Sequence, residues 1–300
     1  MPSEEFRQGL TLMWDMRRER QLGPPATIAG QRADLDGIAA MFPLPDDVSV
    51  TPVVAGTTRC EWVTSPGVAE GRVVLYLHGG AYVAGSPTSH RELAARIGRA
   101  AGARVLVADY RLAPEHPHPA AVVDALAVYR WLLVSEGLPA GSLAVAGDSA
   151  GGGLTIAALV ALRDDAVKLP AAAAVLSPWV DLEGTGASAR SRADEDPVLD
   201  GARLAEMAAC YANGLDLRTP LISPLYADLA GLPPLLIQVG TAEVLLDDAT
   251  RLAAAAREAG VDVTLEVAEE MVHVWQVLSS VPEAGEATTR VGAFLAEHWR

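Results

Sequence analysis

The stretch that decides the fold is Val145-Ala146-Gly147-Asp148-Ser149-Ala150-Gly151-Gly152-Gly153, in which a serine stands at the centre of a G-x-S-x-G motif. A short apolar run, 143–146, precedes the motif, and an apolar, alanine-rich run, 154–162, follows it. This order predicts a strand, a tight turn and a helix, which is the context of a nucleophile elbow. Gly147 and Gly151, the two glycines of the motif, lack a Cβ atom, so the strand and the helix can approach closely. We therefore expect the Ser149 hydroxyl to project at a helix N-terminus, whose dipole favours developing negative charge.

Length and composition restrict the class of protein. The chain has 300 residues, of which 50% are hydrophobic, enough for one large α/β domain with an insertion. Acidic residues outnumber basic ones 38 to 23, and the net charge of −15 argues against nucleic acid and anionic membrane surfaces as partners. Cys60 and Cys210 belong to no C-x-x-C or Cys/His pattern, which predicts free thiols in a reducing compartment.

The sequence carries no recognisable targeting or membrane-spanning segment. Residues 1–6 are acidic and polar, without the basic start or apolar core of a signal peptide. No uninterrupted apolar run approaches the roughly 20 residues of a membrane span. We therefore expect a cytoplasmic protein without stable membrane insertion, and a homodimer is possible.

Strand and helix patterns alternate from residue 73 onward. Alternation of this kind predicts an α/β fold with a mostly parallel central sheet flanked by helices on both faces. The expected strands are 73–77, 104–108, 143–146, 172–176, 235–239 and 263–267, and the expected helices are 90–101, 120–136, 154–162, 247–259 and 286–299.

Two segments do not fit this alternation. One is the N-terminal region before about residue 45, with helical patterns over 3–22 and 31–41. The other is the connection from 181 to about 230, which contains a helical pattern over 202–213. A connection this long inside a compact domain is usually functional. We expect residues 1–45 and 181–230 to form a helical cap over the C-terminal edge of the sheet. The catalytic domain then comprises 46–180 and 231–300. The alternative is that both segments decorate the surface elsewhere.

A glycine pair stands directly after the expected strand 73–77, in His78-Gly79-Gly80-Ala81-Tyr82. Glycines at a strand end let backbone N–H groups point into a cleft, where they can stabilise the oxyanion of a tetrahedral intermediate. The N–H of Ala150, the residue after the serine, would be a further donor. We therefore expect an oxyanion hole from Gly79, Gly80, Ala81 and Ala150. Taken alone, the segment would favour a plain glycine turn, but its pairing with the downstream elbow favours the oxyanion hole.

A serine nucleophile needs a base, and the base needs an orienting acid. Among the six histidines, His273 lies a few residues after the last expected strand, where a loop can present its imidazole to the serine. Glu243 follows the strand 235–239 and is the best-placed carboxylate. Asp247 is the alternative acid, although Asp247 and Asp248 are better suited to cap the following helix.

Four motifs together resemble the bacterial hormone-sensitive lipase family of α/β-hydrolases. The resemblance implies an α/β-hydrolase fold with a helical cap built from the N-terminus and an insertion. It implies Ser149 as nucleophile, His273 as base, and the N–H groups of Gly80, Ala81 and Ala150 as oxyanion donors. The motifs are His78-Gly79-Gly80-Ala81, Asp109-Tyr110-Arg111-Leu112-Ala113-Pro114-Glu115-His116-Pro117, Gly147-Asp148-Ser149-Ala150-Gly151-Gly152 and His273-Val274-Trp275.

The chain departs from the family pattern at two places. Ala81 stands where a third glycine is usual, so its N–H is a donor only if the local backbone conformation suits alanine. Glu243-Val244-Leu245 stands where the family has aspartate, proline and leucine. Glutamate is one methylene longer, so the acid must sit slightly further back.

We therefore predict a serine carboxylesterase that hydrolyses short-chain carboxylic esters through an acyl-enzyme intermediate, with no cofactor and no metal. An amidase or formamidase would use the same acyl-transfer chemistry. A non-catalytic receptor on this fold would be expected to have lost a triad member, whereas all three candidates are present. Apolar residues of the cap and the strand ends are expected to line the substrate pocket: Trp14, Tyr82, Trp179, Leu204, Met207 and Trp275.

Overall fold

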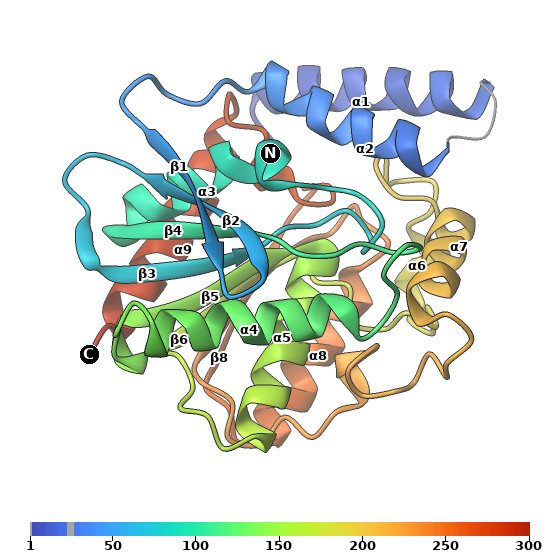
Figure 1. Cartoon of the computed structure of the whole chain (residues 1–300). Coiled ribbons are helices and arrows are strands. Elements are labelled where there is room, and N and C mark those ends of the chain that lie inside the picture. The colour runs from blue at the N-terminus through green and yellow to red at the C-terminus, as the bar shows by residue number, and fades with distance from the viewer. Residues whose placement is uncertain (1, 23–26) are drawn as a thin grey trace.

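A mostly parallel, eight-stranded sheet forms the centre of the molecule (Figure 1), in the strand order β1-β2-β4-β3-β5-β6-β7-β8. The computed structural model describes residues 2–22 and 27–300. The pairs β1–β2 and β2–β4 are antiparallel, and all other neighbouring pairs are parallel. This architecture confirms the predicted fold class. The strands are β1 (Ser49–Ala55), β2 (Thr58–Thr64), β3 (Ala69–Leu77), β4 (Ala103–Asp109), β5 (Leu143–Asp148), β6 (Ala172–Leu176), β7 (Leu235–Gly240) and β8 (Val263–Ala268).

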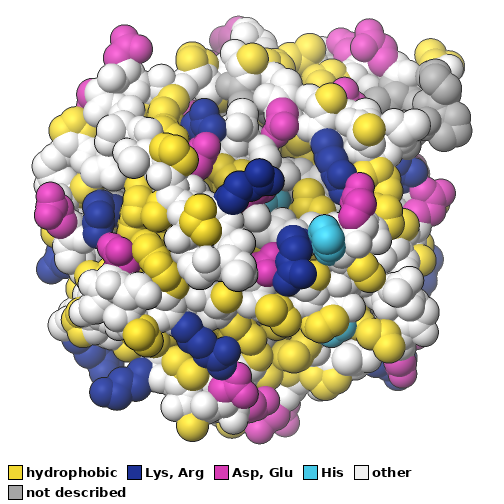
Figure 2. Space-filling model, viewed as in Figure 1, with side chains coloured by type: hydrophobic (Ala, Val, Ile, Leu, Met, Phe, Trp, Pro, Cys, Tyr) yellow, Lys and Arg dark blue, Asp and Glu magenta, His cyan; other side chains and the backbone are white. Residues whose placement is uncertain are grey.

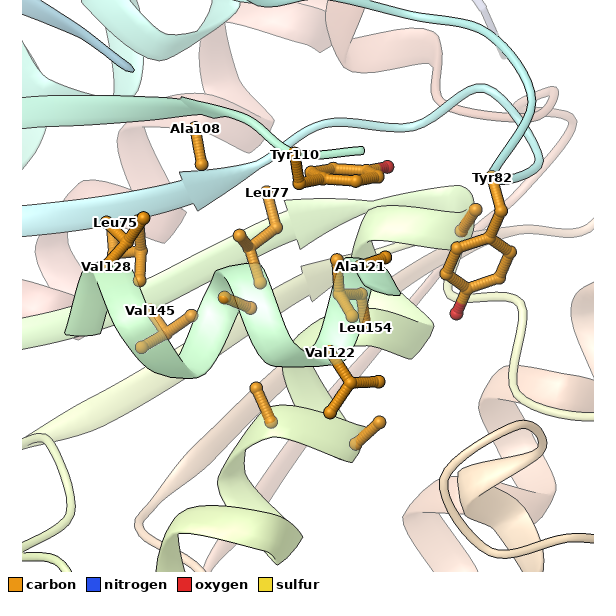
Figure 3. Close-up of a cluster of buried hydrophobic side chains, with 14 of the residues drawn as sticks. Leu75, Leu77, Tyr82, Ala108, Tyr110, Ala121, Val122, Val128, Val145 and Leu154 are labelled. Carbon is orange, nitrogen blue, oxygen red and sulfur yellow. The ribbon is translucent and has the colours of Figure 1, made fainter. Parts of the chain in front are cut away.

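Helices cover both faces of the sheet. Side chains of α3 and α9 pack on one face against alternate residues of the central strands, such as Val74 and Tyr76. On the other face, Leu75 and Leu77 pack with α4 and α5, as Figure 3 shows, and α8 packs beside α5. The helices are α1 (Glu4–Leu22), α2 (Ile28–Ile38), α3 (Pro87–Ala101), α4 (Ala120–Val134), α5 (Ser149–Asp164), α6 (Ser188–Ser191), α7 (Gly201–Ala212), α8 (Leu246–Glu258) and α9 (Pro282–His298).

The N-terminal hairpin β1–β2 was not predicted. Most β1 residues are exposed or half-buried, and the strand contains Pro52, so the hydrophobic pattern is weak. A proline is tolerated there because β1 is the edge strand and lacks a second neighbour. Gly56, with a φ of 65°, makes the turn into β2.

Several predicted helix ends were also wrong by a few residues. Helix α3 begins at Pro87 rather than His90, because Ser86 and Ser89 form a capping box and proline suits the first helical turn. Helix α9 likewise begins at a proline, Pro282, instead of Glu286. Helix α2 covers Ile28–Ile38, and the rest of the predicted helix 31–41 is a short 3-10 turn.

Two arginines attach the N-terminal helices to distant segments. The Arg17 guanidinium of α1 donates to the carbonyl oxygens of Asp196 and Leu199, the latter at 2.8 Å. The Arg32 guanidinium of α2 donates to the carbonyl oxygen of Val83 at 2.8 Å and pairs with Glu115 at 2.7 Å. The N-terminal helices therefore contact the 181–230 insertion and the loops at the carboxyl ends of β3 and β4.

The surface carries no extended basic patch on the face seen in Figure 2, where basic and acidic side chains are scattered among apolar ones. Within the described ranges, no helix combines the length and apolar character needed to cross a membrane.

Candidate active site

Ser149 lies at the sharp turn between β5 and α5, as the motif predicts. It is the first residue of α5 and has a φ of 51°, in the left-handed region that non-glycine residues rarely adopt. A Cβ atom on Gly147 or Gly151 would overlap the carbonyl oxygen of Leu77, so both positions require glycine. The two glycines allow α5 to pack directly on β3 and β5, and this packing holds the serine in its strained conformation.

His273 and Glu243 meet Ser149 at the carboxyl ends of the strands. The Nε2 atom of His273 lies 3.0 Å from the Ser149 hydroxyl oxygen, and its Nδ1 atom lies 2.7 Å from Glu243 Oε2. Because the carboxylate only accepts, Nδ1 carries the proton and Nε2 is free to accept one from the serine. All three side chains are buried. The three residues are therefore connected in the order that proton transfer from the serine requires.

The electrostatic environment makes His273 more basic than an ordinary histidine. Burial by itself lowers the pKa of an imidazole, but the hydrogen bond and the negative charge of Glu243 outweigh this effect. Asp196 and Asp148 act in the same direction, and the pKa of His273 is raised above 6.5. The imidazolium formed after proton transfer is thus stabilised by carboxylates from three parts of the chain.

The carboxylate of Glu243 is held at both oxygens. While Oε2 faces the histidine, Oε1 accepts from the Gly240 amide at 2.6 Å and from the Ser177 hydroxyl at 2.8 Å. The same hydroxyl accepts from the amide of Val274, next to the histidine, at 3.1 Å. Ser177 therefore connects the loop that carries Glu243 (the acid loop, residues 241–245) to the loop that carries His273 (residues 269–274). The sequence patterns did not predict this role. Its position directly after β6 was the available signal.

The expected capping role of Asp247 and Asp248 was wrong. Helix α8 has no side-chain cap at its N-terminus. Asp247 instead accepts from the Ser188 amide at 3.0 Å, and Asp248 accepts from the amides of Val180 and Asp181 at 2.9 and 2.8 Å. Both carboxylates bind the chain that follows β6, which is a long-range contact that local helix chemistry does not predict.

The glycine loop after β3 forms a tight, strained turn. Gly80, Ala81 and Tyr82 have φ values of 117°, 54° and 63°, so three consecutive residues have positive φ. Alanine tolerates the left-handed conformation at a cost of about 1–2 kcal/mol, which glycine would not incur. Ala150 is the second residue of α5, where a helix leaves backbone N–H groups without an intrahelical acceptor.

Gly79 does not belong to the oxyanion hole, contrary to the sequence-based prediction. Its N–H donates to Asp148 Oδ1 at 3.0 Å and so is not available to a substrate. Asp148 also accepts from the Tyr76 hydroxyl at 2.8 Å and lies 3.4 Å from His90 Nε2. This buried carboxylate therefore fixes the start of the glycine loop against the end of β5.

The His78 side chain supports the same loop. It is buried, stacks on Tyr110 with ring centroids 4.2 Å apart, and its Nδ1 lies 2.8 Å from the Gly79 carbonyl oxygen. Burial and the neighbouring His90 lower the pKa of His78 to about 3, so the ring is neutral at physiological pH. The Tyr110 hydroxyl donates to the His78 carbonyl oxygen at 2.6 Å. The 109–117 motif thus acts as scaffolding.

The predicted pocket-wall residues fall into separate groups. Tyr82, labelled in Figure 3, stacks on Tyr211 of α7 at 3.8 Å and lies 6.1 Å from the Trp179 ring. Met207 packs against the same cluster. Trp179 also lines, with Leu204, a cavity of about 210 Å³ beneath α7.

The two remaining tryptophans lie apart from that group. Trp275 packs with Phe6 and Met271 in a different hydrophobic cluster. Trp14 is half-buried on α1, and the Arg17 guanidinium lies 5.6 Å from the centre of its ring. The structure therefore assembles Tyr82, Trp179, Leu204 and Met207 around α7, and it places Trp14 and Trp275 elsewhere.

A serine on a strained strand–helix turn, with a histidine and a buried carboxylate in line behind it, defines this protein as a hydrolase of the α/β type. Proteins of similar sequence support this class. A family model described as the alpha/beta hydrolase fold matches residues 74–277. The "Acetyl-hydrolase" of Streptomyces hygroscopicus is 49% identical over 97% of this chain and 95% of its own length. The "Esterase" of Acinetobacter venetianus is 32% identical over 88% and 87%.

Solved structures are similar over the whole chain. The crystal structure of an esterase from the bacterial hormone-sensitive lipase family superposes with a TM-score of 0.95, is 46% identical and covers 100% of both chains. A crystal structure of EstE5 soaked with p-nitrophenyl butyrate has a TM-score of 0.93, is 44% identical and covers 99% of both chains. The chain therefore belongs to the bacterial hormone-sensitive lipase family of α/β-hydrolases, and it is an ester hydrolase.

Proposed function

We propose that this enzyme is a serine carboxylesterase that uses Ser149, His273 and Glu243. Ser149 Oγ attacks the ester carbonyl carbon while its proton passes to His273 Nε2. The N–H groups of Gly80, Ala81 and Ala150 stabilise the oxyanion. The carbon–oxygen bond to the alcohol then breaks, and the alcohol leaves with the proton held by His273.

Deacylation repeats these steps with water. His273 takes a proton from the attacking water, the acyl–Ser149 bond breaks, and the proton returns to the serine oxygen as the carboxylic acid is released. The observation that carries the proposal is the continuous chain of contacts at 3.0 and 2.7 Å from serine to histidine to glutamate. No step requires a metal or an organic cofactor.

We expect a preference for short acyl chains. The buried rings of Tyr82 and Tyr211 are stacked, the Trp179 ring lies 6.1 Å from that of Tyr82, and the Trp179 amide donates to the Ser149 carbonyl oxygen at 2.9 Å. We infer that these aromatic rings bound the acyl site and limit the length of the chain that it accepts. The name of the Streptomyces relative refers to acetyl groups, and EstE5 was soaked with a four-carbon acyl ester.

A panel of p-nitrophenyl esters tests this preference. The expected kcat/KM is highest for acyl chains of about two to six carbons and falls for longer ones, because we propose that the Tyr82, Trp179 and Tyr211 rings limit the acyl site. The matched p-nitroanilide of the best acyl group is the control for amidase chemistry and should be hydrolysed far more slowly. Peak activity beyond about ten carbons would contradict the short pocket, and a faster anilide would identify an amidase.

The pH profile follows from the raised pKa of His273. Below that pKa the imidazole is protonated and cannot accept the serine proton, so activity is lost on the acid side. We expect kcat/KM to rise with pH through a single ionisation above 6.5 and to remain high on the alkaline side. Initial rates between about pH 5 and pH 9 measure it. A profile that is flat down to about pH 5 would exclude His273 as the base.

A further inference from the structure

Besides Glu243, a carboxylate of the 181–230 insertion is buried beside the acid loop. Asp196 lies between α6 and α7 and is fully buried. Its Oδ1 accepts from the amides of Val198 and Leu199 at 2.8 and 2.9 Å, and its Oδ2 accepts from the amide of Val244 at 3.0 Å. Val244 directly follows Glu243, so the insertion contacts the catalytic loop at the residue next to the proposed acid.

The position of this charge calls for an explanation. Removing a carboxylate from water is costly, and hydrogen bonds from backbone amides offset only part of that cost. A neutral side chain could cap the turn at Val198 and Leu199 without that cost. The negative charge of Asp196 does act on His273, in the same direction as those of Glu243 and Asp148.

The segment around Asp196 is also held by helix α1. The Arg17 guanidinium of α1 donates to the carbonyl oxygens of Asp196, Leu199 and Ala193, and it lies 4.0 Å from the Asp200 carboxylate. Helix α1 thus holds the backbone of the segment while the Asp196 side chain holds the backbone of the acid loop. The described contacts form a continuous connection from the N-terminal helix to the residue after Glu243.

We propose that Asp196 is a positioning residue for catalysis: through the Val244 amide it fixes the loop that holds Glu243 against His273. The inference rests on the triad proposed above. Glu243, the only one of the three carboxylates in contact with the imidazole, orients the ring. Asp196 holds Glu243 in position and adds to the negative electrostatic potential at His273. Asp148 contributes charge from the end of β5.

The Asp196→Asn variant tests this role, with Asp200→Asn as the matched control. Asparagine has similar size but no charge, and its single oxygen cannot accept from both sides. We expect kcat to fall by about 10- to 100-fold, as for a small misplacement of catalytic groups, with KM changed less than about threefold. Asp200 caps α7 near the same arginine but is exposed, and asparagine is an equally good cap. Asp200→Asn should keep kcat within about twofold.

A proton NMR titration separates this role from simple loosening of the structure. The Nδ1 proton shared by His273 and Glu243 reports the protonation of the imidazole in the resting enzyme, without turnover. Loss of the Asp196 charge should move the titration midpoint to lower pH, and Asp200→Asn should not move it. An unchanged or higher midpoint, or a kcat within twofold of the wild type, would overturn the proposal.

The Arg17→Met variant gives a second test if Asp196→Asn does not fold. It leaves the carboxylate in place but removes the guanidinium that holds the segment, so kcat should fall several-fold; an unchanged kcat would overturn the proposal. Covalent labelling of Ser149 in the wild-type enzyme tests the proposed function separately. A wild type that labels at Ser149, together with an unaffected Asp196→Asn, would reject the positioning role alone.

Discussion

Replacing Ser149 with alanine is expected to abolish ester hydrolysis while the protein stays folded. The Ser149 hydroxyl is in contact with His273 Nε2, at 3.0 Å, and among residues 2–22 and 27–300 no second hydroxyl is hydrogen-bonded to that nitrogen. Loss of a nucleophile of this kind costs a factor of about 10³ or more in kcat. The rate with the best short-chain ester, measured beside the circular dichroism spectrum of each protein, gives the result.

Ser142→Ala is the matched control for this experiment. Its hydroxyl is also buried and donates to the Pro139 carbonyl oxygen at 2.9 Å, at the opposite end of β5. This variant should lose some stability, about 1 kcal/mol for one hydrogen bond, and retain activity. Substantial turnover by a folded Ser149→Ala variant would show that another residue is the nucleophile.

Replacing Glu243 with glutamine is expected to lower kcat by about 10³-fold or more, as when the acid of a triad is made neutral. The amide cannot stabilise the imidazolium, and its NH₂ group would face either the His273 N–H or the donors at Gly240 and Ser177. KM should change little, since Glu243 is buried behind the histidine.

Asp247→Asn is the control, because Asp247 was the alternative acid. Its carboxylate binds the Ser188 amide at 3.0 Å. The Asn variant keeps a side-chain oxygen that can accept from this amide, so it should retain kcat within about threefold and lose at most about 1 kcal/mol of stability. The opposite ranking of the two variants would assign the acid to Asp247.

The chemistry around Ser149 was predictable because it depends on neighbours in the sequence. Glycines two residues before and after the serine set the elbow, and the strand patterns predict which residues end at the same edge of the sheet. Chain order then singled out Glu243 and His273, which the fold brings together. The hairpin β1–β2 was missed because an exposed edge strand has little hydrophobic periodicity.

The contacts that support the triad could not be predicted from the sequence in the same way. The partners of Ser177 lie more than 60 residues away along the chain, and Asp196 acts through Val244, 48 residues later. Gly79 was included in the oxyanion hole because its N–H looked free, whereas Asp148 from another strand accepts from it. Such contacts follow from the packing of strands and insertion, which local patterns do not specify. The cap boundaries, the cytoplasmic location and the possible homodimer stay predictions.

Mass spectrometry of the enzyme after reaction with a phosphonate or sulfonyl fluoride tests the central claim most directly. The account predicts one covalent adduct per chain, located on Ser149, with activity lost in proportion to labelling. His273→Ala should slow labelling strongly, because the hydroxyl then has no base. Labelling at another residue, or complete loss of activity while Ser149 remains unmodified, would contradict the proposal that Ser149 is the nucleophile.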